Sequence, residues 1–232
     1  MMQQAAIPLG LDVHLLAEGP DVSAALVVPR TTVGDYTDLE TLRSFAADCE
    51  VITFDHEHVP TKHLRPLDVH VRPGPHALQY AQDKADMRLR MGELGVSSPD
   101  FFVCESADDA IAFAERTQWP IICKTSRGGY DGKGVWKVHD EAEVRDVFAR
   151  KPEVSAGERV RIVAEEFIDF TRELSAIVVR SPSGQVVAYP ISETVQRDGI
   201  CVETTTPAPG LDEDRAAELQ AMAIRIATQL GT

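Results

Sequence analysis

The sequence of 232 residues contains only four cysteines, and none of them belongs to a Cys-x-x-Cys pair. This scarcity argues against a zinc site made of paired cysteines and against a fold held by disulfides. We therefore expect Cys49, Cys104, Cys123 and Cys201 to be reduced thiols in the core of a protein with a cytoplasmic location. No apolar run approaches the roughly 20 residues that a membrane helix needs, so we expect no membrane partner.

Basic residues are also in short supply. There are 23 lysines and arginines against 37 aspartates and glutamates, which gives a formal net charge of -14. Proteins that bind DNA or RNA usually need a basic face, so we expect no nucleic-acid partner. A single nucleotide held by a few lysines is still compatible with this charge. A content of 44% hydrophobic and 26% charged residues is typical of globular proteins.

The first third of the chain alternates between strand-like and helix-like patterns. We expect strands at residues 11–16, 24–28, 51–54 and 69–72, and a helix at residues 39–47. This alternation is typical of an α/β structure with a largely parallel sheet. It predicts a Rossmann-like N-terminal domain over residues 1–73.

A Pro-Gly-Pro sequence at residues 73–75 predicts a domain boundary, and a mixed α+β order follows over residues 74–232. We expect helices at residues 76–94, 107–116, 141–150 and 212–230, and strands at residues 101–103, 120–124, 134–138 and 160–168. Turn residues at 181–184 lie between two apolar runs and predict a hairpin.

The glycine segment, residues 128–134 (GGYDGKG), holds four glycines in seven positions between two predicted strands. Glycine allows positive φ and a close approach of the backbone to a ligand, and successive N–H groups can bind an anion. The segment is not a Walker A loop, because it lacks Gly-Lys-Ser/Thr and leads into a strand. A phosphate-covering loop and a glycine-rich hairpin turn both fit the segment by itself.

Two neighbours favour the phosphate-covering loop. Lys124 ends an apolar strand beside the segment, where its ammonium could contact a phosphate. About forty residues later, Glu165 and Glu166 lie in a predicted strand and Glu173 follows in the next loop. Alone, the lysine is more often a snorkelling side chain and the acidic pair a solvated face. The occurrence of the lysine, the glycine segment and the acidic residues together and in this order favours the phosphate-covering loop over a hairpin turn.

These features resemble the ATP-binding core of the ATP-grasp superfamily. Four ordered motifs, residues 53–60 (TFDHEHVP), 81–84 (AQDK), 129–134 (GYDGKG) and 189–200 (YPISETVQRDGI), further resemble the N5-carboxyaminoimidazole ribonucleotide synthetases. The resemblance implies a pre-ATP-grasp domain followed by an ATP-grasp domain, and an enzyme that is usually a homodimer. It implies that ATP and bicarbonate carboxylate the exocyclic amine of 5-aminoimidazole ribonucleotide in purine biosynthesis, through carboxyphosphate, with release of ADP and phosphate.

The resemblance also implies roles for individual residues. Lys84 and Lys124 would contact ATP phosphates, covered by Gly129, Tyr130, Asp131, Gly132, Lys133, Gly134 and Val135. Backbone groups of Glu165, Glu166, Phe167 and Ile168 would line adenine, Glu173 would bind the ribose, and Gln196 would make another nucleotide contact. Tyr130, Asp131 and Lys133 would face the imidazole ribonucleotide and bicarbonate. Asp131 is then the candidate general base or orienter of the attacking amine, and Lys133 the cation for carboxyphosphate oxygens. Many relatives have arginine at this lysine position.

The sequence His56-Glu57-His58 suggests a metal site at first sight. On an extended segment, however, the two histidines share a face and the glutamate lies on the other. We therefore expect no metal ligand within this chain. The resemblance instead implies that Glu57 lies near the ribonucleotide end of the substrate.

By this resemblance, a first strand and a Gly-x-Gly-Gln-Leu turn are expected before Met1, and the magnesium ligands are expected beyond Thr232. We expect a chain without them to have little or no ligase activity, because magnesium neutralises the phosphates in such reactions. Two alternatives stay open. One is another ATP-grasp enzyme, such as a formate-using glycinamide ribonucleotide transformylase or a biotin carboxylase, and the other is a non-catalytic nucleotide-binding fragment.

Overall fold

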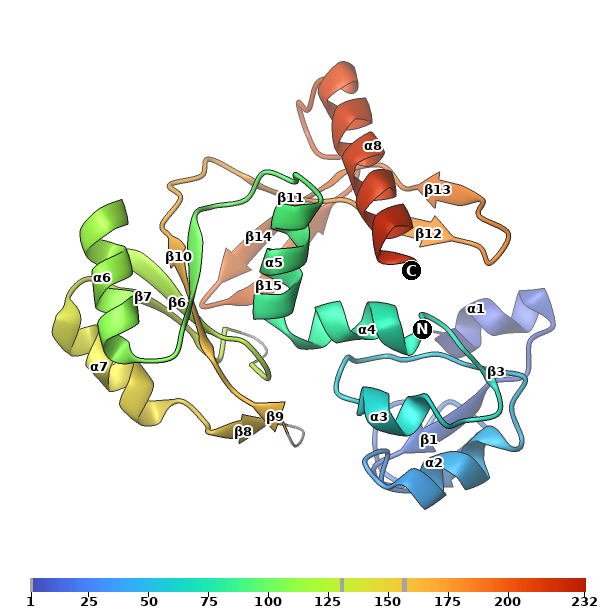
Figure 1. Cartoon of the computed structure of the whole chain (residues 1–232). Helices are drawn as coiled ribbons and strands as arrows, with labels where there is room; N and C mark the ends of the chain where they lie inside the picture. Colours follow the sequence, from blue (N-terminus) through green and yellow to red (C-terminus); the bar gives the residue numbers. More distant parts are fainter. Residues whose placement is uncertain (1, 130–131, 156–157) are drawn as a thin grey trace. The chain divides into compact units, whose positions relative to one another are not determined.

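The computed structural model describes residues 2–129, 132–155 and 158–232 (Figure 1). The polypeptide divides into two compact units, Met1–Leu78 and Gln79–Thr232. Mixed α/β order in both units agrees with the predicted fold class. The domain boundary expected near residue 73 stays a prediction.

The first unit contains two parallel pairs of short strands with helices between them. Its elements are α1 (Met2–Leu9), β1 (His14–Ala17), β2 (Arg30–Val33), α2 (Leu39–Ala46), β3 (Val51–Ile52), α3 (Thr61–Leu64), β4 (His70–Val71) and the start of α4 (Pro75–Gln82). Strand β1 pairs with β2, and β3 pairs with β4, both in parallel. A small core of Leu42, Val59, Leu64, Val71 and Leu78 holds helices and strands together.

The strand expected at residues 24–28 is wrong. This run forms a turn in which the Val28 N–H donates to the Ala24 carbonyl oxygen at 3.0 Å. Leu26 and Val27 are 73% and 59% exposed, and among the larger apolar side chains of the run Val28 alone is buried. A short apolar run has no period that separates strand from turn, and the strand begins later, at Arg30.

A four-stranded antiparallel sheet is the centre of the second unit, with strand order β5-β10-β6-β7. The elements around it are α5 (Lys84–Glu93), β5 (Phe101–Cys104), α6 (Ala107–Thr117), β6 (Ile121–Thr125), β7 (Val135–Val138), α7 (Glu141–Arg150), β8 (Val154–Ser155), β9 (Glu158–Arg159) and β10 (Ile162–Glu166). Helices α6 and α7 cover one face of this sheet, and α5 lies against β10 on the other side (Figure 1). Phe113, Ile121, Val144 and Ile162 are buried in the core under α6 and α7.

A second, three-stranded antiparallel sheet follows, with order β11-β14-β15. The remaining elements are β11 (Glu173–Ser175), β12 (Val178–Arg180), β13 (Val186–Ala188), β14 (Ser192–Arg197), β15 (Ile200–Thr205) and α8 (Glu213–Leu230). The hairpin predicted around residues 181–184 is confirmed as β12–β13, and α8 packs against it (Figure 1). None of the helices in the described parts of the chain is long and apolar enough to cross a membrane.

The single helix expected at residues 76–94 is instead two helices, α4 and α5, separated at Asp83. Asp83 has extended backbone angles (φ -128°, ψ 108°), and its carboxylate accepts hydrogen bonds from the N–H groups of Ala85 and Asp86. Aspartate is a preferred N-cap because it satisfies N–H groups that have no partner within the helix. The apolar periodicity runs across the break and therefore hides it.

The cysteines only partly follow the expectation of core thiols. All four are free. Burial raises the thiol pKa of Cys104 and of Cys123 to about 12. Cys49 is half-buried, whereas Cys201 is exposed on β15, so the expectation is wrong for Cys201.

Candidate functional site

Lys124 takes its place from the alternation of side chains along β6. Ile121, Cys123 and Thr125 point to the buried face, and Lys124 therefore points to the face that α5 approaches. On this strand Lys124 pairs with Val163 of β10 and Val135 of β7. The two neighbouring strands fix the backbone of this lysine beside the place where the glycine segment joins β6 and β7. We call the joining residues, 125–128 and 134–135, the stem of the glycine segment.

The ammonium of Lys124 is held by a buried carboxylate. Lys124 Nζ lies 2.6 Å from Glu165 Oε2. Arg88 on α5 grips the same carboxylate through Nε at 2.7 Å from Oε1 and Nη2 at 3.1 Å from Oε2. The side chain of Glu165 is 5% exposed, against 23% for Lys124 and 26% for Arg88. Glu165 and Lys124 occupy diagonal positions on neighbouring strands, which explains why they meet.

These contacts decide the charge state of Glu165. Burial by itself would raise the pKa of its carboxyl, because the charged form is poorly solvated in the interior. Hydrogen bonds from Arg88 and Lys124, together with their positive charges, outweigh this effect and lower the pKa. Glu165 is therefore a carboxylate at neutral pH, and it fixes the position of the lysine ammonium.

Reasoning from sequence missed Arg88. It lies 77 residues from Glu165, and no local pattern links a helical arginine to a distant strand. The available signal was indirect. A glutamate in a largely apolar predicted strand needs a positive partner if it is buried, and Lys124 alone cannot satisfy both carboxylate oxygens.

A positive φ and close packing against Thr125 explain why glycine is needed at Gly134, in the described part of the glycine segment. Gly134 has φ +79°, and a Cβ there would lie 2.5 Å from Thr125 Oγ1. Its carbonyl oxygen accepts a hydrogen bond from the Thr125 N–H at 2.9 Å. Lys133 is exposed. Tyr130 and Asp131 lie outside the described residues.

The turn between β14 and β15 also lies against the glycine segment, at Gly132. A Cβ at Gly132 would lie 2.9 Å from Gly199 Cα and 3.0 Å from the Asp198 carbonyl oxygen. Asp198 and Gly199 both have positive φ, 52° and 78°, as expected for a two-residue hairpin turn of the Asp-Gly type. The sequence motif at residues 189–200 was recognised, but its hairpin was not predicted, although this dipeptide is a strong hairpin signal.

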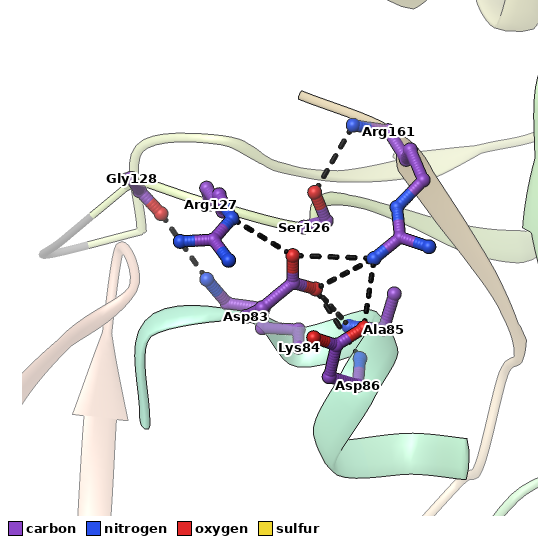
Figure 2. A network of polar contacts seen from close by, with 8 residues as sticks. All are labelled: Asp83, Lys84, Ala85, Asp86, Ser126, Arg127, Gly128 and Arg161. Atoms are coloured by element: carbon purple, nitrogen blue, oxygen red, sulfur yellow. Dashed lines mark hydrogen bonds and ion pairs between the residues drawn. The ribbon is translucent and has the colours of Figure 1, made fainter. Parts of the chain in front are cut away.

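Lys84 approaches the glycine segment from a different direction, at the start of α5 (Figure 2). Its Nζ donates to the Gly128 carbonyl oxygen at 3.1 Å, and its backbone N–H donates to the Ser126 carbonyl oxygen at 2.8 Å. Lys84 and Lys124, which are forty residues apart in sequence, are thus both located at the stem of the glycine segment. Such a pair of ammonium groups suits a chain of phosphates.

Glu173 and Gln196 are brought together on neighbouring strands. Gln196 Nε2 donates to Glu173 Oε1 at 2.8 Å, and Thr194 Oγ1 donates to the same oxygen at 2.7 Å. The pairing of β11 with β14 places these groups side by side. A carboxylate and an amide in this arrangement can bind hydroxyl groups.

The residues predicted to line adenine follow directly from Glu165 at the end of β10. Glu166 and Phe167 are half-buried, and Ile168 and Val135 are each 42% exposed. The Lys137 ammonium lies 3.7 Å from the centroid of the Phe167 ring, a cation–π contact. The end of this strand therefore offers the partly exposed apolar side chains of Phe167 and Ile168.

Glu57 belongs to the first unit and is half-buried in a turn. The rings of His56 and His58 are 5.3 Å apart, and His56 also contacts the Tyr36 ring at 4.9 Å. Across residues 2–129, 132–155 and 158–232, no group of three or more histidine, cysteine, aspartate or glutamate side chains is arranged to hold a metal ion.

The sheet, the paired lysines and the glycine segment define a class of protein. Residues 89–232 match the ATP-grasp domain family, and residues 1–82 match the ribonucleotide synthetase pre-ATP-grasp domain. The first match covers more than half of the chain. The chain therefore belongs to the ATP-grasp family.

Particular relatives narrow this class. The chain is 45% identical over its full length to the N5-carboxyaminoimidazole ribonucleotide synthase of Mycobacterium tuberculosis, of which it covers 54%. It is similar to the N5-carboxyaminoimidazole ribonucleotide synthetase structure from Thermus thermophilus, with a TM-score of 0.85, 29% identity and coverage of 99% of this chain and 61% of that one. The Staphylococcus aureus N5-carboxyaminoimidazole synthetase complexed with ADP gives a TM-score of 0.86 at 26% identity, with 99% and 60% coverage.

The chain spans about half the length of the curated relatives that it matches. The similarity extends over both units of this chain. The activity, substrates and partners of a complete enzyme are thus proposals for this chain, and the residues described above are their physical basis.

Proposed function

We propose that this chain forms the nucleotide-binding part of a ligase that uses ATP and bicarbonate to carboxylate 5-aminoimidazole ribonucleotide. One observation carries the proposal. Lys84 and Lys124 come from separate segments and are both located at the stem of the glycine segment. The 45% identity to a protein named N5-carboxyaminoimidazole ribonucleotide synthase supports the proposed substrate class.

In this proposal the two lysines bind the phosphates of ATP, and the backbone of residues 129–135 covers them. The side chains of Arg88 and Glu165 do not need to touch the nucleotide. They hold the Lys124 ammonium in place before ATP arrives, so that less side-chain freedom is lost on binding. A phosphate oxygen can then take over part of the role of the Glu165 carboxylate as the partner of Lys124.

The rest of the nucleotide would lie along the ends of β10 and β11. Backbone groups of Glu165, Glu166, Phe167 and Ile168 are proposed to line adenine, with the Phe167 side chain as apolar support. Glu173 is proposed to accept hydrogen bonds from the ribose hydroxyls, and Gln196 fixes its carboxylate through a 2.8 Å hydrogen bond.

The chemical step follows from the poor leaving group of bicarbonate. Transfer of the γ-phosphoryl group of ATP to bicarbonate would give carboxyphosphate and ADP. The amine of the imidazole ribonucleotide would then attack the carboxyl carbon, phosphate would leave, and Asp131 would take or orient the amine proton. Lys133 would stabilise the charged oxygens, Tyr130 would face the substrate, and Glu57 would bind its ribonucleotide end. The glycine segment would exclude water from the reactive intermediate.

Magnesium would neutralise charge on the phosphates in such a reaction. None of the described residues is assigned as its ligand, because they contain no suitable cluster of side chains. A homodimer and a cytoplasmic location are further parts of the proposal. They rest on the similarity to the purine-synthesis enzymes named above.

The test measures ADP formation by a version of the protein extended to the full length of the curated relatives, because little or no ligase activity is expected of this chain by itself. The assay contains ATP, magnesium, bicarbonate and 5-aminoimidazole ribonucleotide, and omits one component at a time. The proposal expects ADP release above background that disappears when bicarbonate or the imidazole ribonucleotide is left out. ADP release that depends on formate and glycinamide ribonucleotide, or on biotin, would instead identify another ATP-grasp activity. ATP binding without any turnover would reduce the function of this chain to nucleotide binding.

A further inference from the structure

Asp83 is a buried charge at the point where three segments of the second unit meet (Figure 2). It is 2% exposed. Its carboxylate accepts from Arg127 Nε at 2.9 Å and from Arg161 Nη2 at 3.3 Å and 3.2 Å. It also accepts from the N–H groups of Ala85 and Asp86 at 2.9 Å and 3.2 Å. The start of α5, the stem of the glycine segment and the start of β10 are joined through this one carboxylate.

Other helices of the chain show what a cap alone requires. Asp38, Asp140 and Asp212 also cap helices, through one backbone N–H three residues later, and all three caps are exposed. A buried ion pair is weak evidence for stability, because removal of the charges from water offsets much of their attraction. Capping therefore does not explain why Asp83 is buried between two arginines.

Ser126 completes the junction on the other side. It is fully buried, its N–H donates to the Arg161 carbonyl oxygen at 2.8 Å, and its Oγ accepts from the Arg161 N–H at 3.0 Å. Its carbonyl oxygen accepts from the Lys84 N–H at 2.8 Å. Arg161 also binds Asp86 at 3.0 Å. Lys84 follows Asp83 directly in sequence. Because its N–H is bonded to Ser126, which is bonded to Arg161, Lys84 is connected to the same three segments as Asp83.

We propose that Asp83 is a positioning residue that locks Lys84 and the stem of the glycine segment together as a preformed cradle for phosphate. This inference rests on the proposed function for its consequence, and on the contacts of Asp83 for its mechanism. In this role Asp83 does not contact the phosphate itself. It acts by fixing the backbone of Lys84 and, through Arg127, the first residues of the glycine segment.

The variant Asp83→Asn separates charge from capping, because asparagine is an equally good N-cap but cannot pair with two arginines. We expect ATP to bind about tenfold more weakly, as the loss of a charge-assisted contact implies, and adenosine to bind unchanged. In the double variant Asp83→Asn with Lys84→Met, the fold-loss in ATP affinity should be smaller than the product of the fold-losses of the two single variants, since Asp83 acts through Lys84.

The matched control is Asp140→Asn, the same change at the exposed N-cap of α7, which lies in the same unit and caps through the Glu143 N–H. We expect it to leave the affinity for ATP unchanged. Equal affinities for ATP in the wild type, the Asp83 variant and the Asp140 variant would overturn the inference. So would a loss in the Asp83 variant that adds fully to the loss in the Lys84 variant.

Hydrogen exchange tests the mechanism without any nucleotide. The Lys84 N–H is bonded to Ser126, so its exchange rate, followed by NMR, reports the locking of the junction. We expect Asp83→Asn to raise this rate at least about tenfold over that of Asp140→Asn, with little change at the core amides of β6. If the wild type binds no ATP, the proposed function fails, but the faster exchange of the Lys84 N–H in Asp83→Asn can still be observed and would support the positioning role. Unchanged exchange at Lys84 contradicts the positioning role in either case.

Discussion

Two buried carboxylates in the second unit, Glu165 and Asp83, are each held between two cationic side chains, yet they are built in opposite ways. Glu165 lies in strand β10, and helix α5 supplies one of its cations, Arg88. Asp83 lies at the start of α5, and the residue before β10 supplies one of its cations, Arg161. Ion pairs of opposite polarity therefore join the same helix to the same strand.

The second cation of each pair shows how the two sites differ in purpose. At Glu165 it is Lys124, which also points toward the place where phosphates are proposed to bind. At Asp83 it is Arg127, the residue that directly precedes the glycine segment in sequence. One carboxylate thus orients a side chain that is proposed to bind the ligand, and the other fixes the backbone. Variants of the two sets should differ accordingly.

The largest effect is expected for Glu165→Ala. It leaves the positive charges of Arg88 and Lys124 without their shared partner, and we expect the second unit to lose about 3 kcal/mol of stability. Both tryptophans of the chain, Trp119 and Trp136, pack against the core of this unit, so their fluorescence in a denaturant titration reports its unfolding.

The control for this experiment is Glu115→Ala on the exposed side of α6, where we expect a change within about 0.5 kcal/mol. If the two alanine variants unfolded at the same denaturant concentration, Glu165 would not be the junction described here.

A smaller loss of stability is expected when one cation is removed from either carboxylate, and its size should differ between Glu165 and Asp83. Arg88→Met removes one of two cations from Glu165, and we expect a loss of about 2 kcal/mol. Arg127→Met removes one cation from Asp83, which keeps Arg161 and two backbone N–H groups, so we expect about 1 kcal/mol. Methionine retains the apolar part of the side chain. The same fluorescence titration measures both, and a reversed order would contradict the comparison.

The smallest effect is the pH dependence of stability that comes from Glu165. Its pKa is lowered in the folded state, so the unfolded chain takes up a proton at higher pH than the folded chain does. The contribution is fully present above the ordinary pKa of about 4.3 and is lost as pH falls through the lower folded value. Glu165→Gln lacks it. We expect the stability difference between wild type and this variant to shrink from about pH 6 to about pH 3.5. A constant difference would refute this origin.

The sequence allowed much of this arrangement to be predicted. The apolar run that ends at Lys124 identified β6, and the glycines at residues 128–134 identified the segment that follows it. Both depend on local pattern, in which neighbours in sequence determine the structure. The family resemblance added the order of the two domains, which the matches to both domain families confirm.

Other parts could not be predicted in this way. The contacts of Asp83 with Arg161 and of Arg88 with Glu165 join residues 78 and 77 positions apart, and such pairs leave no trace in local periodicity. The break between α4 and α5 was missed because apolar spacing continues across Asp83. Strand β15 was missed although Asp198-Gly199 signals a hairpin turn before it, because every residue of the strand is exposed and its sequence lacks the alternation of a half-buried strand.

The central claim is that lysines from two segments bind the phosphates of one nucleotide, and calorimetric titration with ATP and with adenosine tests it most directly. In Lys124→Met, Arg88 still pairs with Glu165 and supports the fold. The account predicts that this variant and Lys84→Met each bind ATP at least about tenfold more weakly than the wild type, with adenosine affinity within about twofold. Unchanged ATP affinity, or equal losses for ATP and adenosine, would contradict it.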